Sequence, residues 1–216
     1  MLKIGLTQRV LEFAAVGERR DCLDQAWTEL LVPLGYLPVP LPNAIADEEG
    51  VAALVTGLGL HGVILTGGND LVGLPGARNA APERDRFEHL LIDVCGKRNL
   101  PLLGVCRGLQ VLVCHAGGTL AVTEGHAGTR HALRAEGGSA MPLSDREEVN
   151  SYHDFALDAD SLGGDLDPVA RAADGSVEAV VHRHLPIWGI MWHPEREPRD
   201  ARDAALLRAF FGEAIG

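Results

Sequence analysis

Short apolar runs alternate with longer amphipathic segments through the first half of the chain, and this alternation constrains the fold more than any other feature. The apolar runs have the length of buried strands and cover residues 3–7, 36–40, 62–65 and 101–105. The amphipathic segments have helical periodicity and cover residues 21–34, 47–58, 82–98 and 107–114. Such alternation predicts parallel strands that are joined by right-handed helical crossovers.

The second half of the chain has a different pattern. Short strands with intervening turns are predicted within residues 130–149, 169–173, 177–181 and 187–191, followed by a closing helix at 201–211. Residues 125–138 are rich in Gly, Ala and His, and we expect them to form a loop. The prediction is a three-layer α/β fold, flavodoxin-like, with a mostly parallel central sheet, helices on both faces and a small antiparallel extension. We expect residues 1–216 to form a single domain.

Composition narrows the classes of function. Of the 216 residues, 46% are hydrophobic, which predicts a folded globule, and the net charge of −11 argues against binding nucleic acid or anionic membranes. The amino-terminal stretch has no long apolar region of the kind a secretory signal needs, and no window suits a membrane span, so we expect a cytoplasmic protein. The four cysteines include no CxxC pair, so we predict neither a metal site nor a cofactor.

The stretch around Cys106 carries the strongest chemical signal. A predicted strand leads into Gly104-Val105-Cys106-Arg107-Gly108, and a predicted helix follows. This is the thiol form of the nucleophile elbow, in which a tight strand-to-helix turn leaves no room for side chains two residues before and after the nucleophile. The helix amino terminus favours the thiolate. The alternative is a buried structural cysteine, which we expect for the other three, on apolar helix faces: Cys22, Cys95 and Cys114.

A thiol nucleophile needs a base, and His193 is the best candidate among nine histidines. It follows the apolar strand at 187–191 and lies in Trp192-His193-Pro194-Glu195, so it should reach the same sheet edge as Cys106. Glu195 can accept a hydrogen bond from the imidazole and set its tautomer.

An oxyanion formed during attack needs backbone donors at the same edge. Thr66-Gly67-Gly68-Asn69-Asp70 follows a predicted strand, so Gly67 or Gly68 can supply one N–H, and Arg107 the second. A plain glycine turn is the alternative. A phosphate loop is excluded, because neither of the glycine-rich phosphate motifs is present.

The elbow, the Gly-Gly loop and His-Pro-Glu, in this order, resemble class I glutamine amidotransferases. Within these, the chain is similar to the stand-alone γ-glutamyl hydrolases of the peptidase C26 group, which includes γ-glutamyl-γ-aminobutyrate hydrolase. The matching stretches span almost the whole chain and comprise residues 5–9, 65–70, 104–110, 117–120, 149–153 and 192–195.

The resemblance implies a catalytic triad of Cys106, His193 and Glu195, and an oxyanion hole from the N–H groups of Gly68 and Arg107. It also implies hydrolysis of a small-molecule γ-glutamyl amide through a thioester on Cys106. The substrate-binding residues implied are Gly67, Asn69, Gln110, Asn150, Ser151, Tyr152 and His153.

The leaving group is less well specified. The chain is shorter than expected for the γ-aminobutyrate enzymes, Val113 stands where Asn is common, and Asp154 stands where a second His is frequent. The compact form is similar to short members that hydrolyse γ-glutamyl-CDP-amidate during phosphoramidate assembly for capsule or lipopolysaccharide. Candidate contacts to such a leaving group are Arg19, Arg20, His126 and Arg130.

Three other functions fit parts of the pattern. A glutaminase subunit would supply ammonia to a separate synthetase, an inactive relative would bind ligands on the same fold, and a cysteine peptidase would share the elbow. The residues that favour an active stand-alone hydrolase are Cys106, His193 and Glu195. A homodimer would be compatible with any of these functions.

Overall fold

The computed structural model describes residues 1–138, 140–143, 147–157 and 159–212. The strands of its main sheet are β1 (Leu2–Leu6), β4 (Tyr36–Pro40), β5 (Gly62–Leu65), β6 (Leu102–Val105), β7 (Leu120–Val122), β8 (Ala127–Ala135), β9 (Glu148–Tyr152), β10 (Phe155–Leu157), β11 (Leu166–Ala172), β12 (Val177–His182) and β13 (Ile187–Ile190). The helices are α1 (Gln25–Leu31), α2 (Glu48–Leu58), α3 (Pro82–Arg98), α4 (Arg107–His115) and α5 (Ala201–Phe211), with short 3₁₀ turns η1 (Val32–Leu34) and η2 (Ala159–Ser161).

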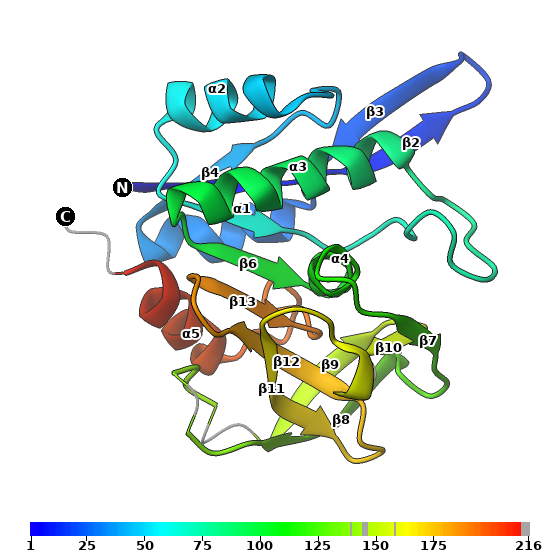
Figure 1. The fold of residues 1–216 in the computed structure, drawn as a ribbon, viewed down its shortest axis with the longest axis vertical. Helices are drawn as coiled ribbons and strands as arrows, with labels where there is room; N and C mark the ends of the chain where they lie inside the picture. The colour runs from blue at the N-terminus through cyan, green and yellow to red at the C-terminus, as the bar shows by residue number, and fades with distance from the viewer. Residues whose placement is uncertain (139, 144–146, 158, 213–216) are drawn as a thin grey trace.

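The sheet has a parallel part and an antiparallel part. Its strand order is β4-β1-β5-β6-β13-β12-β11-β8-β9, with β10 and β7 branching from β12. Pairing is parallel from β4 through β13 and antiparallel from β13 onward. The predicted mostly parallel sheet with an antiparallel extension is therefore confirmed, and the strand at 187–190 belongs to the parallel part because it pairs with β6 (Figure 1).

Helices cover both faces of the parallel strands, as expected for three layers (Figure 1). Successive residues of β5 face opposite cores: Ile64 packs in one hydrophobic cluster with residues of α1 and α5, whereas Val63 and Leu65 pack in the other with α2 and α3. Because both faces are buried, the strand reads as a continuous apolar run.

An amino-terminal hairpin was not predicted. β2 (Arg9–Phe13) pairs antiparallel with β3 (Glu18–Cys22), and in Figure 1 this hairpin projects from the body of the molecule. The prediction of a helix from residue 21 was wrong at its start, since α1 begins at Gln25 after Asp24, whose side chain accepts a hydrogen bond from the Ala26 N–H. Cys22 therefore lies on a strand rather than on a helix.

Residues 125–138 also differ from expectation. Most of this segment forms β8, which pairs with β9 and β11, instead of the predicted loop. Residues 139 and 144–146 belong to the stretch 130–149, where strands were predicted, and they lie outside the described residues. Within the described residues, no helix combines the length and apolar content needed to cross a membrane.

Candidate active site

Cys106 occupies the turn between β6 and α4 in a strained backbone conformation. Its φ of 52° and ψ of −106° are uncommon for a residue with a side chain. The turn is held by neighbouring structure, since the Cys106 N–H donates to the Ile190 carbonyl at 2.8 Å and its own carbonyl accepts from Gln110 at 3.1 Å. The geometry matches that of a nucleophile elbow.

The two glycines of the elbow are required by close backbone approach. A Cβ on Gly104 would lie 2.7 Å from the carbonyl carbon and oxygen of Gly108, and a Cβ on Gly108 would overlap the carbonyl oxygen of Leu65. Real Cβ atoms do not come this close to backbone atoms, so any larger residue would move α4 away from the sheet.

His193 and Glu195 lie beside the thiol. Nδ1 of His193 is 2.7 Å from Oε1 of Glu195, and both side chains are buried. The carboxylate can only accept, so Nδ1 carries the proton and Nε2 is left for the thiol. Burial opposes protonation of His193, but the charge and hydrogen bond of Cys106, together with Glu195, raise its pKa to about 9. His193 therefore carries a positive charge beside the thiol at neutral pH.

The 66–70 loop faces the same thiol from the end of β5. Gly68 has a φ of +83° and lines a pocket together with Cys106. Arg84 on α3 donates to the carbonyls of Thr66 at 2.6 Å, Gly67 at 3.2 Å and Gly68 at 2.8 Å. Because C=O and N–H point in opposite directions in a trans peptide, holding the Gly67 carbonyl on Arg84 turns the Gly68 N–H away from α3.

A buried charge network supports this loop and the elbow together. The Arg84 side chain pairs with Glu88 at 2.9 Å, and the Arg107 side chain pairs with Glu88 and Asp85. Burial and neighbouring Arg107 lower the pKa of Arg84 to about 10, so it remains charged at neutral pH. Burial alone would raise the pKa of Glu88, but the two arginines hold it below its ordinary value. Sequence inspection missed this network, whose only local signal is the i,i+4 pair Arg84 and Glu88.

Cys106 opens into a polar pocket of about 460 Å³. Seven of the other residues singled out from the sequence line it: Gly68, Asn69, Arg107, Gln110, Tyr152, His153 and Arg19. Residues that were not predicted to contact the substrate also line it, and five of these are charged: Arg9, Glu12, Asp70, Arg78 and Asp154. Arg9 follows β1 at the carboxyl edge of the sheet, which is the one signal that could have identified it.

Other predicted residues lie elsewhere. Gly67 faces the imidazole, since a Cβ there would be 2.7 Å from Cε1 of His193. Ser151 is fully buried, and Arg20 and Arg130 pair on the surface with Glu18 and Glu148 respectively. His126 is not among the residues that line the pocket, and it lies instead next to His131 and His153.

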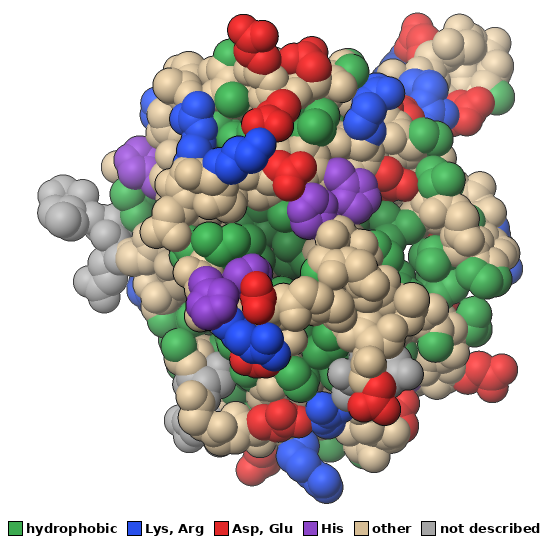
Figure 2. Space-filling model, in the orientation of Figure 1, with side chains coloured by type: hydrophobic (Ala, Val, Ile, Leu, Met, Phe, Trp, Pro, Cys, Tyr) green, Lys and Arg blue, Asp and Glu red, His purple; other side chains and the backbone are tan. Residues whose placement is uncertain are grey.

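A second pocket, of about 370 Å³, lies near the amino ends of β6 and β13. Figure 2 shows it as a hollow with hydrophobic side chains on its floor, and Leu112, Leu185 and Ile187 are among its lining residues. Cys106 is not one of the residues that line it. The carboxyl edge of the sheet, where the thiol lies, is therefore the better candidate for the reaction site.

Fold and site together define a protein of the class I glutamine amidotransferase type. A GMP synthase subunit from Thermoplasma acidophilum has the same fold, with a TM-score of 0.72 over 99% of this chain and 94% of that chain at 21% identity. The sequence matches the family model Peptidase C26 over residues 4–195. The chain belongs to the peptidase C26 family, and it is a hydrolase.

Two curated relatives cover nearly the whole chain. A γ-glutamyl-CDP-amidate hydrolase of Campylobacter jejuni subsp. jejuni serotype O:2 is 32% identical over 211 residues, which cover 96% of each protein. A γ-glutamyl-γ-aminobutyrate hydrolase of Escherichia coli O157:H7 is 30% identical over 90% of this chain and 85% of the relative.

Proposed function

We propose that this protein hydrolyses a γ-glutamyl amide whose leaving group carries phosphate, as in γ-glutamyl-CDP-amidate. The observation that carries the proposal is the position of Cys106 at a pocket whose lining includes three arginines besides the buried Arg107, namely Arg9, Arg19 and Arg78. The relative that is similar over 96% of both chains is named for this substrate, which supports the same assignment here.

The reaction proceeds in two steps. The Cys106 thiolate attacks the γ-carbonyl carbon, and the N–H groups of Gly68 and Arg107 stabilise the oxyanion. The His193 imidazolium donates its Nε2 proton to the leaving nitrogen, which leaves a γ-glutamyl thioester and neutral His193. His193 then takes a proton from water as the water attacks the thioester, and glutamate departs while the ion pair re-forms. For γ-glutamyl-CDP-amidate, the other product is cytidine diphosphoramidate.

Arg107 can serve this chemistry only through its backbone. Its side chain is buried and held by Glu88 and Asp85, so it is not available to the substrate. Its N–H lies in the first turn of α4, where helical geometry offers no intrahelical acceptor. Gln110, one turn further on, lines the pocket and donates to the Phe155 carbonyl at 3.2 Å, so its amide oxygen is placed to accept from the glutamyl ammonium group.

The arginines lie where the leaving group would emerge. Arg9 and Arg19 belong to the β2–β3 hairpin, and Arg78 belongs to the segment before α3. Arg19 is also paired with Glu12 and Glu83, which fixes its guanidinium at the pocket wall. Guanidinium groups bind phosphate through paired hydrogen bonds, and they can do so on a protein of net negative charge because the interaction is local.

A second candidate substrate is γ-glutamyl-γ-aminobutyrate, on the strength of the Escherichia coli relative. Its leaving group is also an anion, though with one carboxylate in place of two phosphates. Glutamine is the substrate expected for the alternative function, a glutaminase subunit. Its hydrolysis releases ammonia, which a separate synthetase would consume.

The test is a glutamate-release assay on purified protein with γ-glutamyl-CDP-amidate, γ-glutamyl-γ-aminobutyrate and glutamine as separate substrates. We expect kcat/KM to be highest for the first and activity to vanish in Cys106→Ala with the circular dichroism spectrum unchanged. Preference for γ-glutamyl-γ-aminobutyrate would overturn the leaving-group assignment alone. Wild-type activity in Cys106→Ala would overturn the nucleophile, and glutamine turnover only with a second protein would favour the synthetase-coupled function.

A further inference from the structure

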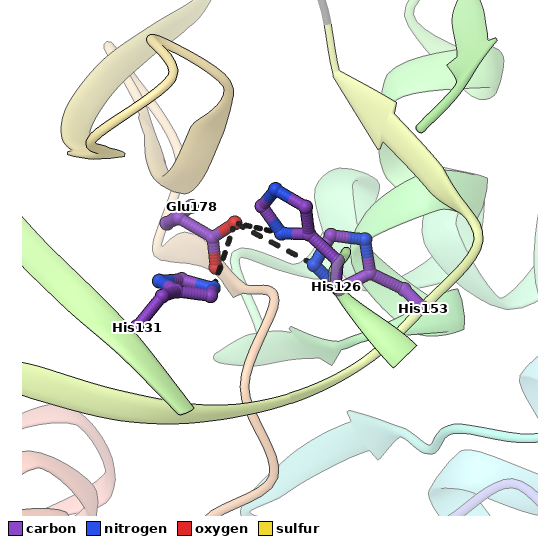
Figure 3. Close-up of side chains that lie close together, drawn as sticks. All are labelled: His126, His131, His153 and Glu178. Carbon is purple, nitrogen blue, oxygen red and sulfur yellow. Dashed lines mark ion pairs between the residues drawn. The ribbon is translucent and has the colours of Figure 1, made fainter. Parts of the chain in front are cut away.

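Four side chains with the chemistry of metal ligands converge in the antiparallel part of the sheet, outside the catalytic group. They are His126, His131, His153 and Glu178, and their candidate ligand atoms all lie within 4.8 Å of one another (Figure 3). His126 immediately precedes β8 and His131 lies within it, whereas His153 is the residue after β9 and Glu178 lies on β12. The register Ala127–Tyr152 between β8 and β9 makes His126 and His153 neighbours.

The carboxylate at the centre of this cluster is buried without a hydrogen bond. Glu178 is fully buried, and neither of its oxygens has a hydrogen-bond partner among the described residues. The facing ring nitrogens, Nδ1 of His126 and Nε2 of His131 and His153, are buried and lack hydrogen-bond partners there as well. Burying so many polar atoms without partners is costly, and each such group in a folded protein needs an explanation.

In each histidine, the ring nitrogen that does not face Glu178 makes a hydrogen bond that orients the ring. Nε2 of His126 donates to Oδ2 of Asp174 at 2.9 Å, Nδ1 of His131 to the Ala132 carbonyl at 3.2 Å, and Nδ1 of His153 to the Phe155 carbonyl at 3.0 Å. A carboxylate or carbonyl can only accept, so these nitrogens carry the protons. The three remaining nitrogens then present lone pairs toward Glu178, which is the arrangement that metal-ligating histidines adopt.

The distances suit a small tetrahedral ion. Oε1 of Glu178 lies 3.8 Å from Nδ1 of His126, 3.6 Å from Nε2 of His131 and 3.5 Å from Nε2 of His153. Zinc bonds of about 2.0–2.2 Å place the corners of a tetrahedron about 3.3–3.6 Å apart. These separations are too long for direct hydrogen bonds, which span about 2.7–3.2 Å.

An ion pair between Glu178 and a protonated histidine would leave the site incomplete. A proton on one of the three histidines would balance the negative charge of Glu178. The other two imidazoles would still have buried lone pairs without hydrogen-bond donors. A divalent cation satisfies all four ligands at once, and its second charge is balanced by Asp174 through His126.

We propose that His126, His131, His153 and Glu178 form a structural binding site for a divalent transition-metal ion, with zinc the best fit to three imidazoles and one carboxylate. The site departs from the sequence prediction of no metal. Four protein ligands in a buried setting leave no open position for a reacting water, so the ion stabilises structure instead of taking part in the reaction.

The ion would tie the catalytic pocket to the antiparallel strands. His153 lines the pocket, and the carbonyl of Phe155 accepts from both His153 and Gln110. A metal on Nε2 of His153 would therefore hold the pocket wall formed by the end of β9 in place. The inference does not depend on the proposed substrate.

Metal binding is tested directly, without an activity readout. Tag-free Cys106→Ala protein, which lacks the thiol as a competing ligand, is stripped with chelator and titrated with Zn²⁺ by calorimetry, and the metal content of untreated wild-type protein is measured by mass spectrometry. We expect one zinc per chain and a rise in Tm as zinc is added back. Co²⁺ in its place should give the intense visible absorption of a tetrahedral site.

Ligand variants locate the site. Glu178→Gln and His131→Ala, each in the Cys106→Ala background, should weaken zinc binding by about 100-fold or more. His184→Ala removes an exposed histidine outside the cluster and should leave stoichiometry and affinity unchanged. Undiminished binding in the ligand variants would overturn the assignment. The assignment would also be overturned if the folded, metal-free Cys106→Ala protein failed to bind zinc. That experiment does not require any ligand variant to fold. Because Cys106→Ala is the inactive variant, neither outcome bears on the proposed hydrolase function.

Discussion

The side-chain amide of Asn150 holds both backbone polar groups of His193. Its Oδ1 accepts from the His193 N–H at 2.8 Å, and its Nδ2 donates to the His193 carbonyl at 2.9 Å. A residue on β9 thereby fixes the position of the imidazole that follows β13, although 43 residues separate them in the chain. We infer from this contact that Asn150 positions His193 for the proposed reaction.

Asn150→Ala should lower kcat by about 10- to 100-fold, because small displacements of a catalytic group are costly, and should leave KM nearly unchanged. Steady-state kinetics measures both. Glu148→Gln, an exposed change on the same strand, serves as the control and should behave as wild type. A rise in KM with unchanged kcat would instead indicate that Asn150 contacts the substrate.

The pH profile should report the ionisation of His193. Burial works against its charge, but Cys106 and Glu195 raise its pKa to about 9, so the imidazolium that donates to the leaving nitrogen persists below that pH and is lost above it. We expect kcat/KM to fall as pH rises through about 9. Glu195→Gln removes a charge that favours the imidazolium and should move this alkaline limb to lower pH. An unmoved limb would show that another group controls it.

Alkylation should distinguish the four cysteines. Cys106 faces the pocket beside a charged imidazole, whereas burial raises the pKa of Cys95 to about 12 and also raises the pKa of Cys114. Iodoacetamide at neutral pH should therefore modify Cys106 first, with the half-buried Cys22 later. Peptide mapping by mass spectrometry gives the order. If Cys22, Cys95 or Cys114 reacted faster than Cys106, the thiolate assignment would fail.

Two glycine substitutions should have opposite effects. Gly108→Ala would push a methyl group into the Leu65 carbonyl and should destabilise the fold by several kcal/mol, with loss of activity. Gly57 lies in α2, where an added Cβ would meet none of the described atoms within 4 Å, so Gly57→Ala should stabilise by about 0.5–1 kcal/mol. Urea denaturation measures both. Equal tolerance of the two changes would contradict the close packing of the elbow.

The pocket arginines should control the leaving group. Arg9→Gln and Arg78→Gln should each raise KM for γ-glutamyl-CDP-amidate by about tenfold or more, since a charge-assisted hydrogen bond contributes about 1.5–3 kcal/mol. Glutamine, which offers no phosphate, should be turned over as before. Arg183→Gln, on the surface near Asp165 and Asp167, is the matched control. Equal losses with both substrates would exclude phosphate recognition by these side chains.

Local patterns identified much of the fold and the site. Helix α2 and strand β5 follow from periodicity and length, and the helix cap at Asp47 marks a boundary correctly. The elbow could be predicted from the sequence because its glycines, the strand before it and the helix after it are adjacent in the chain. The hairpin of β2 and β3 was missed because its residues, mostly exposed, do not alternate between apolar and polar as half-buried strands do.

The sequence by itself determined the alternation of strands and helices, the elbow at Cys106 and the pairing of His193 with Glu195, because each depends on residues close together in the chain. Only the tertiary structure decided that Asn150 holds His193, that Arg84 holds the 66–70 loop, and that three histidines surround Glu178. These contacts depend on strand register and on how α3 packs against the sheet. Single histidines, asparagines and arginines far apart in the chain carry no spacing from which their partners can be inferred.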